Sequence, residues 1–217
     1  MITAIVFDFD GVLADSEPLH LRTYQDVLGA AGITLGRDEY YARYLGFDDE
    51  GAFRQIVADK GLMLADEELE LLLAEKARRF EALVLEADVL YPGAPACVDR
   101  LASYPLGIAS GALRHEIEMP LRAARLLDRF RFIVAAEDAE RTKPDPEPYI
   151  RAAALHAAPP SACVAIEDSH WGLQSARAAG LRTIAVTHTY PREALTDADV
   201  VVESLDELTA ELIASLA

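Results

Sequence analysis

Residues 3–12 read Thr-Ala-Ile-Val-Phe-Asp-Phe-Asp-Gly-Val. The first half of this stretch is apolar, which predicts a fully buried β-strand at the start of the chain. Asp8 and Asp10 follow at the mouth of that strand. Two carboxylates at the end of a buried strand are costly unless a positive charge pairs with them. The stretch therefore predicts a buried strand with a cation site at its end.

The composition bounds the class of protein. The 217 residues are 52% hydrophobic, enough to bury a sizeable core. The chain carries 37 acidic and 20 basic residues, a formal net charge of −17, which opposes binding to nucleic acid or an anionic membrane surface. No stretch reaches transmembrane length, and no basic start with a cleavage site precedes the first strand. We therefore expect a cytoplasmic protein with a small-molecule partner.

The order of the predicted elements indicates one fold class. Residues 15–87 have helical apolar spacing and no convincing strand, which predicts an all-helical insertion. Beyond residue 88, short apolar runs alternate with helices, which is typical of right-handed βαβ units and a parallel sheet. We expect a doubly wound (Rossmann-like) α/β core formed by residues 1–14 and 88–217, with a helical cap at 15–87. The predicted later strands are 106–109, 132–135, 163–166, 183–186 and 200–202.

Polar residues of a coherent kind follow four of these strands. Besides Asp8 and Asp10, they are Ser110, Lys143 and the pair Glu167-Asp168. Each alone is as well explained by a helix cap, a turn or a solvated loop charge. Together they offer hard oxygen ligands for Mg²⁺, a hydroxyl and an ammonium, which is what the transfer of a phosphoryl group needs. Because ligands bind beyond the carboxyl ends of parallel strands, these residues form the candidate site.

The four segments resemble the four motifs of the haloacid dehalogenase superfamily, in order and over the whole chain. The helical insertion resembles the cap of the subfamily that contains β-phosphoglucomutase and phosphoglycolate phosphatase. The segments are the following: Asp8-Phe9-Asp10-Gly11-Val12, Ser110, Lys143-Pro144 and Glu167-Asp168-Ser169-His170-Trp171-Gly172.

The resemblance implies a role for each residue. Asp8 matches the nucleophile that becomes an aspartyl-phosphate, and Asp10 matches the general acid and base, whose pKa should be raised. Ser110 and the backbone N–H of Gly111 would hold the phosphoryl group, and Lys143 would bridge it and Asp8.

The resemblance also implies a metal site. Mg²⁺ would be held by the side chain of Asp8, the backbone carbonyl of Asp10 and Asp168, with Glu167 in or near its coordination shell. Asp10 argues against the dehalogenase branch, whose members lack the second Asp.

A phosphatase and a phosphosugar mutase differ in where the phosphoryl group goes after Asp8. The mutase holds a second phosphate with anion-binding side chains. The positions that align with them here are Asp48-Asp49, Ala112 and Leu113, which are acidic or apolar, and this difference favours a phosphatase. His20, Lys76 and Arg114 are candidate substrate-binding residues, and they keep a phosphosugar mutase open.

The expected function is therefore a Mg²⁺-dependent phosphatase acting on a small phosphorylated metabolite, such as a sugar phosphate or phosphoglycolate. A non-enzymatic phosphosugar-binding protein is the third alternative, although a binding module needs neither Asp8 nor Asp10. We expect a monomer.

Overall fold

The computed structural model describes residues 1–45, 47–87 and 89–216. The chain divides into two compact units. An α/β unit comprises Met1–Asp15 and Val89–Ala217, and a helical unit comprises Ser16–Asp88. Each boundary lies one residue after the predicted one. The main chain of Asp15 still belongs to the α/β unit, because its N–H donates to the carbonyl of Val89 (2.7 Å).

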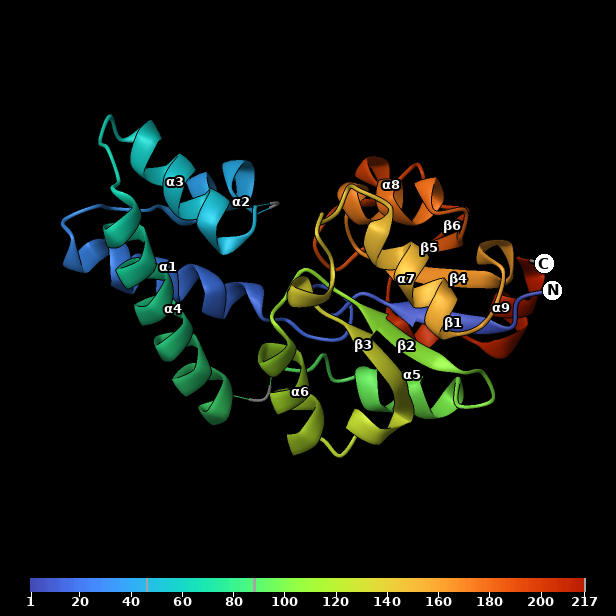
Figure 1. Cartoon of the computed structure of the whole chain (residues 1–217). Helices are drawn as coiled ribbons and strands as arrows, with labels where there is room; N and C mark the ends of the chain where they lie inside the picture. The colour runs from blue at the N-terminus through green and yellow to red at the C-terminus, as the bar shows by residue number, and fades with distance from the viewer. Residues whose placement is uncertain (46, 88, 217) are drawn as a thin grey trace. The chain divides into compact units, whose positions relative to one another are not determined.

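A six-stranded parallel sheet forms the centre of the α/β unit, with strand order β3-β2-β1-β4-β5-β6 (Figure 1). This is the order of a doubly wound Rossmann-like fold, so the predicted fold class is confirmed. The strands are β1 (Ala4–Phe7), β2 (Leu106–Ala109), β3 (Phe130–Val134), β4 (Cys163–Glu167), β5 (Arg182–Val186) and β6 (Val200–Val202).

The predicted strand bounds differ from the observed ones by at most two residues. β3 begins two residues before the predicted start, and its second residue, Arg131, is exposed. β3 is an edge strand with a charged residue near its start, so a search for continuous apolar runs places its start after Arg131. In contrast, all four residues of β1 and of β2 are buried.

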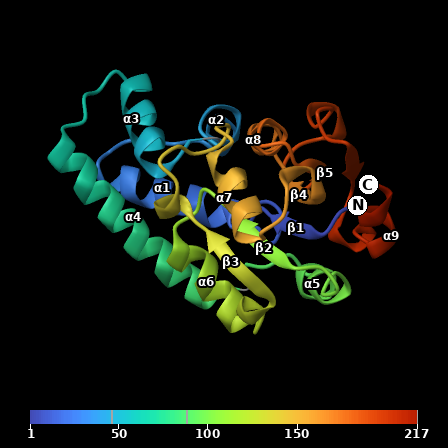
Figure 2. The same cartoon turned by 45° about the vertical axis from the view of Figure 1, so that its right-hand side comes forward.

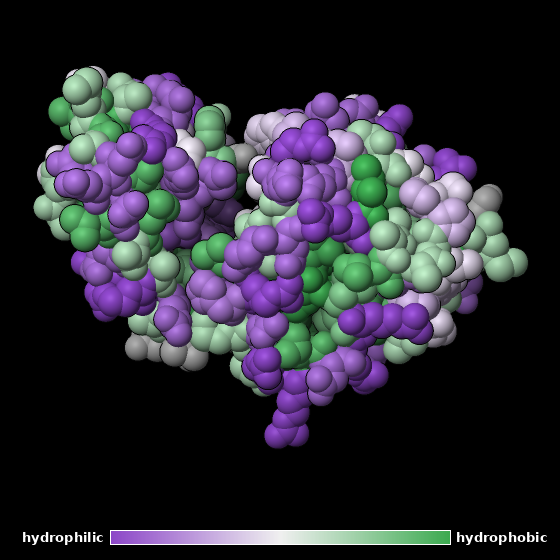
Figure 3. All heavy atoms as spheres, in the orientation of Figure 1, coloured by the Kyte–Doolittle hydropathy of each residue, from purple (hydrophilic) through white to green (hydrophobic). Residues whose placement is uncertain are grey.

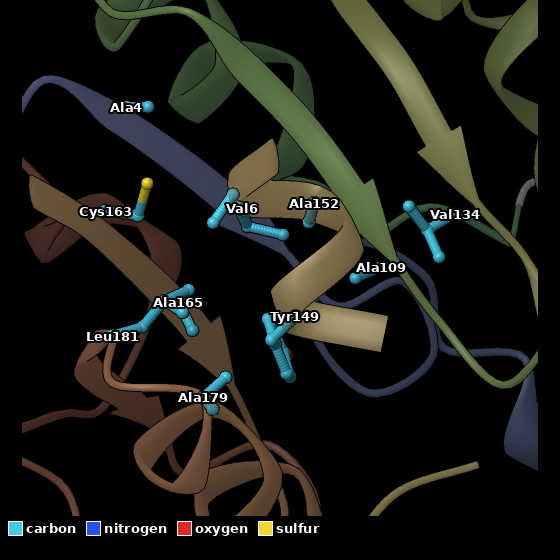
Figure 4. Close-up of a cluster of buried hydrophobic side chains, with 12 residues drawn as sticks. Ala4, Val6, Ala109, Val134, Tyr149, Ala152, Cys163, Ala165, Ala179 and Leu181 are labelled. Carbon is cyan, nitrogen blue, oxygen red and sulfur yellow. The ribbon is translucent and has the colours of Figure 1, made fainter. Parts of the chain in front are cut away.

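Helices cover both faces of the sheet (Figures 1 and 2). α7 and α8 cover one face, where Tyr149 and a set of alanines pack against Val6 of β1 (Figure 4). α5, α6 and α9 lie on the opposite face. These helices are α5 (Ala94–Arg100), α6 (Arg114–Ala123), α7 (Glu147–Leu155), α8 (His170–Ala178) and α9 (Ala210–Ser215). Short 3-10 turns occupy Leu127–Arg129, Ala136–Asp138, Pro160–Ala162, Arg192–Ala194 and Leu205–Glu207.

The helical unit has its own core. Its helices are α1 (Glu17–Ala30), α2 (Arg37–Arg43), α3 (Asp49–Asp59) and α4 (Asp66–Glu86). Asp48 caps α3 by accepting a hydrogen bond from the backbone N–H of Gly51 (2.7 Å), which satisfies a donor that the helix itself leaves unpaired. Phe53, Leu28 and Ile56 are fully buried in this core.

None of the helices in the described ranges is long and apolar enough to cross a membrane.

Candidate active site

The site lies where the strand order of the sheet reverses. β1 pairs with β4 in parallel register, with Phe7 opposite Ile166, and the N–H of Asp8 donates to the carbonyl of Ile166 (2.9 Å). From β1 the chain runs outward to β2 and β3, whereas β4 begins the other half of the sheet. Such a switch point opens a crevice at the carboxyl ends of the strands. Asp8 follows β1 there, beside Glu167 at the end of β4.

Lys143 joins the two carboxylates. Its Nζ lies 3.0 Å from Asp8 Oδ2 and 2.6 Å from Glu167 Oε1. The Lys143 and Asp8 side chains are each 12% exposed, and that of Glu167 is fully buried. Burial opposes the charge on the ammonium, but Asp8 and Glu167 together hold the pKa of Lys143 above its usual value. Lys143 is therefore a fixed cation between two strand ends.

One ammonium does not balance the carboxylates gathered here. Asp8, Glu167 and Asp168 are all buried, and each places a carboxylate oxygen within 4.8 Å of the others. Burial and the neighbouring Glu167 raise the pKa of Asp8 to about 7, although Lys143 acts against them. Burial, Glu167 and Asp8 likewise raise the pKa of Asp168. Three buried oxygen donors short of positive charge suit a hard divalent cation.

Two glycines make room for these carboxylates. A Cβ on Gly11 would lie 1.9 Å from Asp168 Oδ2, and Gly11 has φ +75°, a conformation that favours glycine. A Cβ on Gly172 would lie 1.9 Å from the Glu167 carboxyl carbon. Both positions therefore require glycine, because a carboxylate occupies the space that a Cβ would fill. One glycine follows β1 and the other follows β4, on the two sides of the switch point.

Glu167 is held by four donors. Its Oε1 accepts from Lys143 Nζ and from the hydroxyl of Tyr149, both at 2.6 Å. Its Oε2 accepts from the N–H of Asp168 and from Ser169 Oγ, both at 3.2 Å. A carboxylate offers about four lone-pair sites. Protein donors therefore occupy the hydrogen-bonding capacity of Glu167, and Asp8 and Asp168 are the better candidates for direct metal ligation.

Ser110 and Gly111 follow β2, the other neighbour of β1. Ser110 is buried, its N–H donates to the carbonyl of Val134 (3.0 Å), and its Oγ accepts from the N–H of Ala112 (3.1 Å). Gly111 is exposed, with nothing within 4 Å of where a Cβ would be. The turn after β2 therefore places the exposed Gly111 next to Ser110, whose backbone and hydroxyl are held by hydrogen bonds. The predicted phosphate-binding roles of both residues stay predictions.

Asp10 lies in the loop after β1 and is partly exposed. Its backbone forms a bridge with Ala14, and the N–H of Gly11 donates to the carbonyl of Ala14 (2.8 Å). This tight loop fixes the Asp10 main chain next to Asp8. Its predicted roles, as acid and base and as a carbonyl ligand, stay predictions.

Sequence reasoning missed three residues that support this site. Tyr149 on α7 donates to Glu167, and burial and Glu167 raise the pKa of its hydroxyl, which keeps it protonated. Thr189 hydrogen-bonds to Asp168 and so lowers its pKa against the effect of burial. His188 donates from Nδ1 to the carbonyl of Gly11 (3.0 Å). Thr189 and His188 follow β5, another strand end, and that position is the signal that could have found them.

The helical unit contains a separate charged cluster around Lys76. The Lys76 side chain is fully buried, and its Nζ lies 2.8 Å from Asp49 Oδ2 and 2.8 Å from His20 Nδ1. The Tyr24 hydroxyl donates to Asp49 Oδ1 (2.6 Å), and the His20 ring stacks on Phe80 (4.1 Å between centroids). Burial and Lys76 lower the pKa of His20 to about 3. The structure thus brings two predicted substrate residues together with Asp49.

Arg114, the third predicted substrate residue, is engaged elsewhere. It begins α6 and forms a salt bridge with Asp138, and its guanidinium also donates to the carbonyl of Ile133 in β3 (3.0 Å). Its side chain is 41% exposed. The described contacts of Arg114 therefore lie at the β3 edge of the sheet and with Glu118 on its own helix (3.9 Å).

Comparison with known proteins places the chain in a family. The haloacid dehalogenase-like hydrolase family matches residues 5–186, so the chain belongs to that family. Hexitol phosphatase B of Escherichia coli (strain K12) is 34% identical over 230 residues, covering 97% of this chain and 96% of that protein. The chain is accordingly an enzyme of the haloacid dehalogenase-like hydrolase family.

Two further proteins are similar over nearly their whole length. β-Phosphoglucomutase of Bacillus subtilis (strain 168) is 28% identical over 214 residues, covering 97% of this chain and 93% of that protein. The crystal structure of CbbY from Rhodobacter sphaeroides in complex with phosphate matches with a TM-score of 0.86 and 29% identity over 96% of both chains. A mutant of the same protein is known in complex with xylulose-(1,5)bisphosphate.

Proposed function

We propose that this enzyme is a Mg²⁺-dependent phosphatase that hydrolyses a small phosphorylated metabolite, of the sugar phosphate or phosphoglycolate kind, through an aspartyl-phosphate on Asp8. The observation that carries the proposal is the Lys143 ammonium between Asp8 and Glu167, beside Asp168. An ammonium fixed on a carboxylate nucleophile is placed to neutralise the oxygens of a phosphoryl group that the nucleophile attacks.

The residues of the chain supply both halves of the reaction. A carboxylate oxygen of Asp8 attacks phosphorus, the bond from phosphorus to the ester oxygen breaks, and Asp10 gives its proton to that leaving oxygen. Asp10, now a carboxylate, then takes a proton from a water molecule that attacks phosphorus. The bond between Asp8 and phosphorus breaks, inorganic phosphate leaves, and both carboxyl groups return to their starting states. Ser110, the Gly111 N–H and Lys143 hold the phosphoryl oxygens throughout.

The donor set fits a magnesium ion. Asp8, Asp168 and the Asp10 carbonyl would hold it, with Glu167 fixing the surrounding groups. When bound, the ion supplies the positive charge that lets an anionic carboxylate approach a phosphate. The raised pKa of Asp8, about 7, is consistent with a site that is short of positive charge.

The Lys76 cluster favours hydrolysis over mutase chemistry. A mutase must bind a substrate with a second phosphate, which calls for free cationic groups. Asp49 stands in the segment that aligns with a mutase arginine, and it pairs with Lys76 (2.8 Å). We propose that this neutralised pair, with His20, selects monophosphate substrates, and that Arg114 plays no part in selection.

The test is phosphate release from a panel of small phosphate esters, with Mg²⁺ and after chelation, by the wild type, Asp8→Asn and Asp10→Asn. We expect release that depends on Mg²⁺, is abolished in Asp8→Asn, and falls about 10²–10⁴-fold in Asp10→Asn. Full activity of Asp8→Asn, or release without metal, would refute the mechanism.

A second assay separates phosphatase from mutase. The enzyme is incubated with β-glucose 1-phosphate and a catalytic amount of the corresponding bisphosphate. We expect free phosphate to form faster than glucose 6-phosphate, and the opposite order would identify a mutase.

A further inference from the structure

Tyr149 is a buried polar residue that none of the predicted roles uses. It lies on α7, six residues after Lys143, among Val6, Ala109 and Ala165 (Figure 4). Its side chain is fully buried in this otherwise apolar cluster. A hydroxyl in such surroundings needs a hydrogen-bond partner, and the partner here is Glu167 Oε1 at 2.6 Å.

The same oxygen of Glu167 also binds Lys143. Both donors lie 2.6 Å from Oε1, and the Lys143 ammonium lies 5.1 Å from the centre of the Tyr149 ring. Tyr149 therefore interacts with Lys143 in two ways. Its ring lies beside the ammonium, and its hydroxyl binds the same Glu167 oxygen that the ammonium binds. Because Lys143 Nζ is also 3.0 Å from Asp8 Oδ2, the placement of Glu167 decides where the ammonium meets the nucleophile.

From these contacts we propose that Tyr149 is a positioning residue: its hydroxyl fixes the Glu167 carboxylate, and through it the Lys143 ammonium, against Asp8. The role rests on the proposed function, since it is the chemistry at Asp8 that Lys143 serves. Tyr149 itself touches no reacting atom. Gly172 leaves the space that Glu167 occupies, and Ser169 and the Asp168 N–H hold the other oxygen. Tyr149 is the donor that shares an oxygen with the lysine.

Tyr149→Phe isolates the hydroxyl, because it keeps the ring, its packing and its contact with Lys143. We expect kcat for the best substrate of the panel to fall about 10–100-fold, the range seen when a group that orients an active-site residue is lost. KM should change little, because the substrate does not contact the hydroxyl. Tyr104→Phe is the matched control: Tyr104 lies before the amino end of β2 and donates to the carbonyl of Ala210 (3.5 Å), so its kcat should equal that of the wild type.

A readout without substrate or metal follows from the lysine content. The chain has three lysines, Lys60, Lys76 and Lys143, so the nitrogen-15 NMR spectrum of the lysine ammonium groups is simple. In Mg²⁺-free protein we expect the Lys143 signal of Tyr149→Phe to shift, or to broaden through faster proton exchange. The Lys76 signal, from the buried group that Asp49 holds, should stay as in the wild type and so reports intact folding.

The outcomes distinguish this role from the phosphatase proposal. An unchanged Lys143 signal together with an unchanged kcat in Tyr149→Phe would overturn the positioning role and leave the phosphatase intact. A wild type that hydrolyses no phosphate ester would refute the phosphatase, whereas the NMR test of the contact would still stand.

One measurement needs no substitution. The Tyr149 hydroxyl proton of the wild type should give a downfield resonance protected from exchange with water, and its absence would contradict a fixed donor.

Discussion

Two lysines, the fully buried Lys76 and the mostly buried Lys143, differ in the charge of their surroundings. Lys143 in the α/β unit meets Asp8 and Glu167, with Asp168 next to them. Lys76 in the helical unit meets Asp49 and His20. The first cluster sets three carboxylates against one ammonium, and the second sets one against one. The first cluster is therefore short of positive charge, whereas the charges of Lys76 and Asp49 balance in the second.

The pKa values follow this difference. Burial and Glu167 raise the pKa of Asp8 to about 7. Burial also acts to raise the pKa of Asp49, but Lys76 and His20 outweigh it and hold that pKa below its usual value. A carboxylate that remains readily ionised is a stable structural partner. One that resists ionisation until a cation arrives is suited to a metal site.

The packing around the two clusters differs as well. Gly11 and Gly172 approach the carboxylates of the first cluster so closely that a Cβ would collide with them. Aromatic rings surround the second: the Lys76 ammonium lies 5.4 Å from the centre of Tyr24 and 4.9 Å from that of Phe80. Glycine backbone therefore packs against the carboxylates of the first cluster, whereas aromatic rings pack against the ammonium of the second.

The largest expected effect is that of replacing Asp8, which should abolish activity and yet increase stability. Asp8→Asn should abolish phosphate release, because the nucleophile is gone. In Mg²⁺-free buffer it should also raise the free energy of unfolding, because it removes one of three mutually repelling buried carboxylates. Phosphate assays and urea unfolding measure the two effects. A destabilised Asp8→Asn protein would show that the cluster is balanced without a cation.

Removal of Lys76 should strongly destabilise the protein. Lys76→Met leaves Asp49, whose side chain is 30% exposed, without its cationic partner, at a cost of about 1–3 kcal/mol in the free energy of unfolding. The double variant Lys76→Met with Asp49→Leu should recover most of that loss, since apolar residues can replace a buried pair.

The matched pair in the α/β unit is Lys143→Met with Asp8→Asn. This double variant should recover less of the lost stability, because Glu167 and Asp168 remain as two buried carboxylates without a neighbouring cation. Equal recovery in the two units, measured by urea unfolding, would remove the contrast between the clusters.

The two clusters should respond to pH in opposite directions. In metal-free protein, folded Asp8 keeps its proton up to about pH 7, whereas the unfolded group loses it near its ordinary pKa of 3.8. Stability should therefore fall as pH rises through this window, by at most about 4 kcal/mol. Folded His20 stays neutral down to about pH 3, against an ordinary pKa of 6.5, so its contribution is lost as pH falls below 6.5.

Urea unfolding across this range, in the presence of a chelator, tests both signs. Asp8→Asn should weaken the fall in stability with rising pH, of which Asp168, whose pKa is also raised, retains a part. His20→Gln should lose the fall with decreasing pH. Parallel pH profiles for the two variants would contradict the assignment.

The smallest expected effect is a loss of stability on filling the space next to Glu167. Gly172→Ala should destabilise the protein by about 1–3 kcal/mol through overpacking, and it should lower kcat because Glu167 must move. The control is Gly29→Ala in α1, where nothing lies within 4 Å of the added Cβ. That variant should be stabilised by about 0.4–1 kcal/mol. Thermal unfolding of both variants is the measurement, and a tolerated Gly172→Ala would show that Glu167 can shift without consequence.

The sequence determined the sheet and its chemistry to a large extent. Continuous apolar runs predicted β1, β2 and β4 to within one residue, because strands buried on both faces have no alternation to obscure them. The switch point and its acidic residues followed, since parallel strands bring their carboxyl ends to one edge. Asp8, Lys143, Glu167 and Asp168 were predicted in this way to lie together, from positions far apart in the chain, and the structure brings them together.

Tertiary structure decided which partner each of these groups has. Nothing in the sequence around Tyr149 marks its hydroxyl as a donor to Glu167, because an aromatic residue on a helix facing a sheet is equally consistent with core packing. The pairing of Lys76 with Asp49 is similarly hidden, 27 positions apart on two helices. Local patterns report which residues are apolar or charged, whereas the balance of charge in a buried cluster depends on side chains that only the packed fold brings within hydrogen-bonding distance.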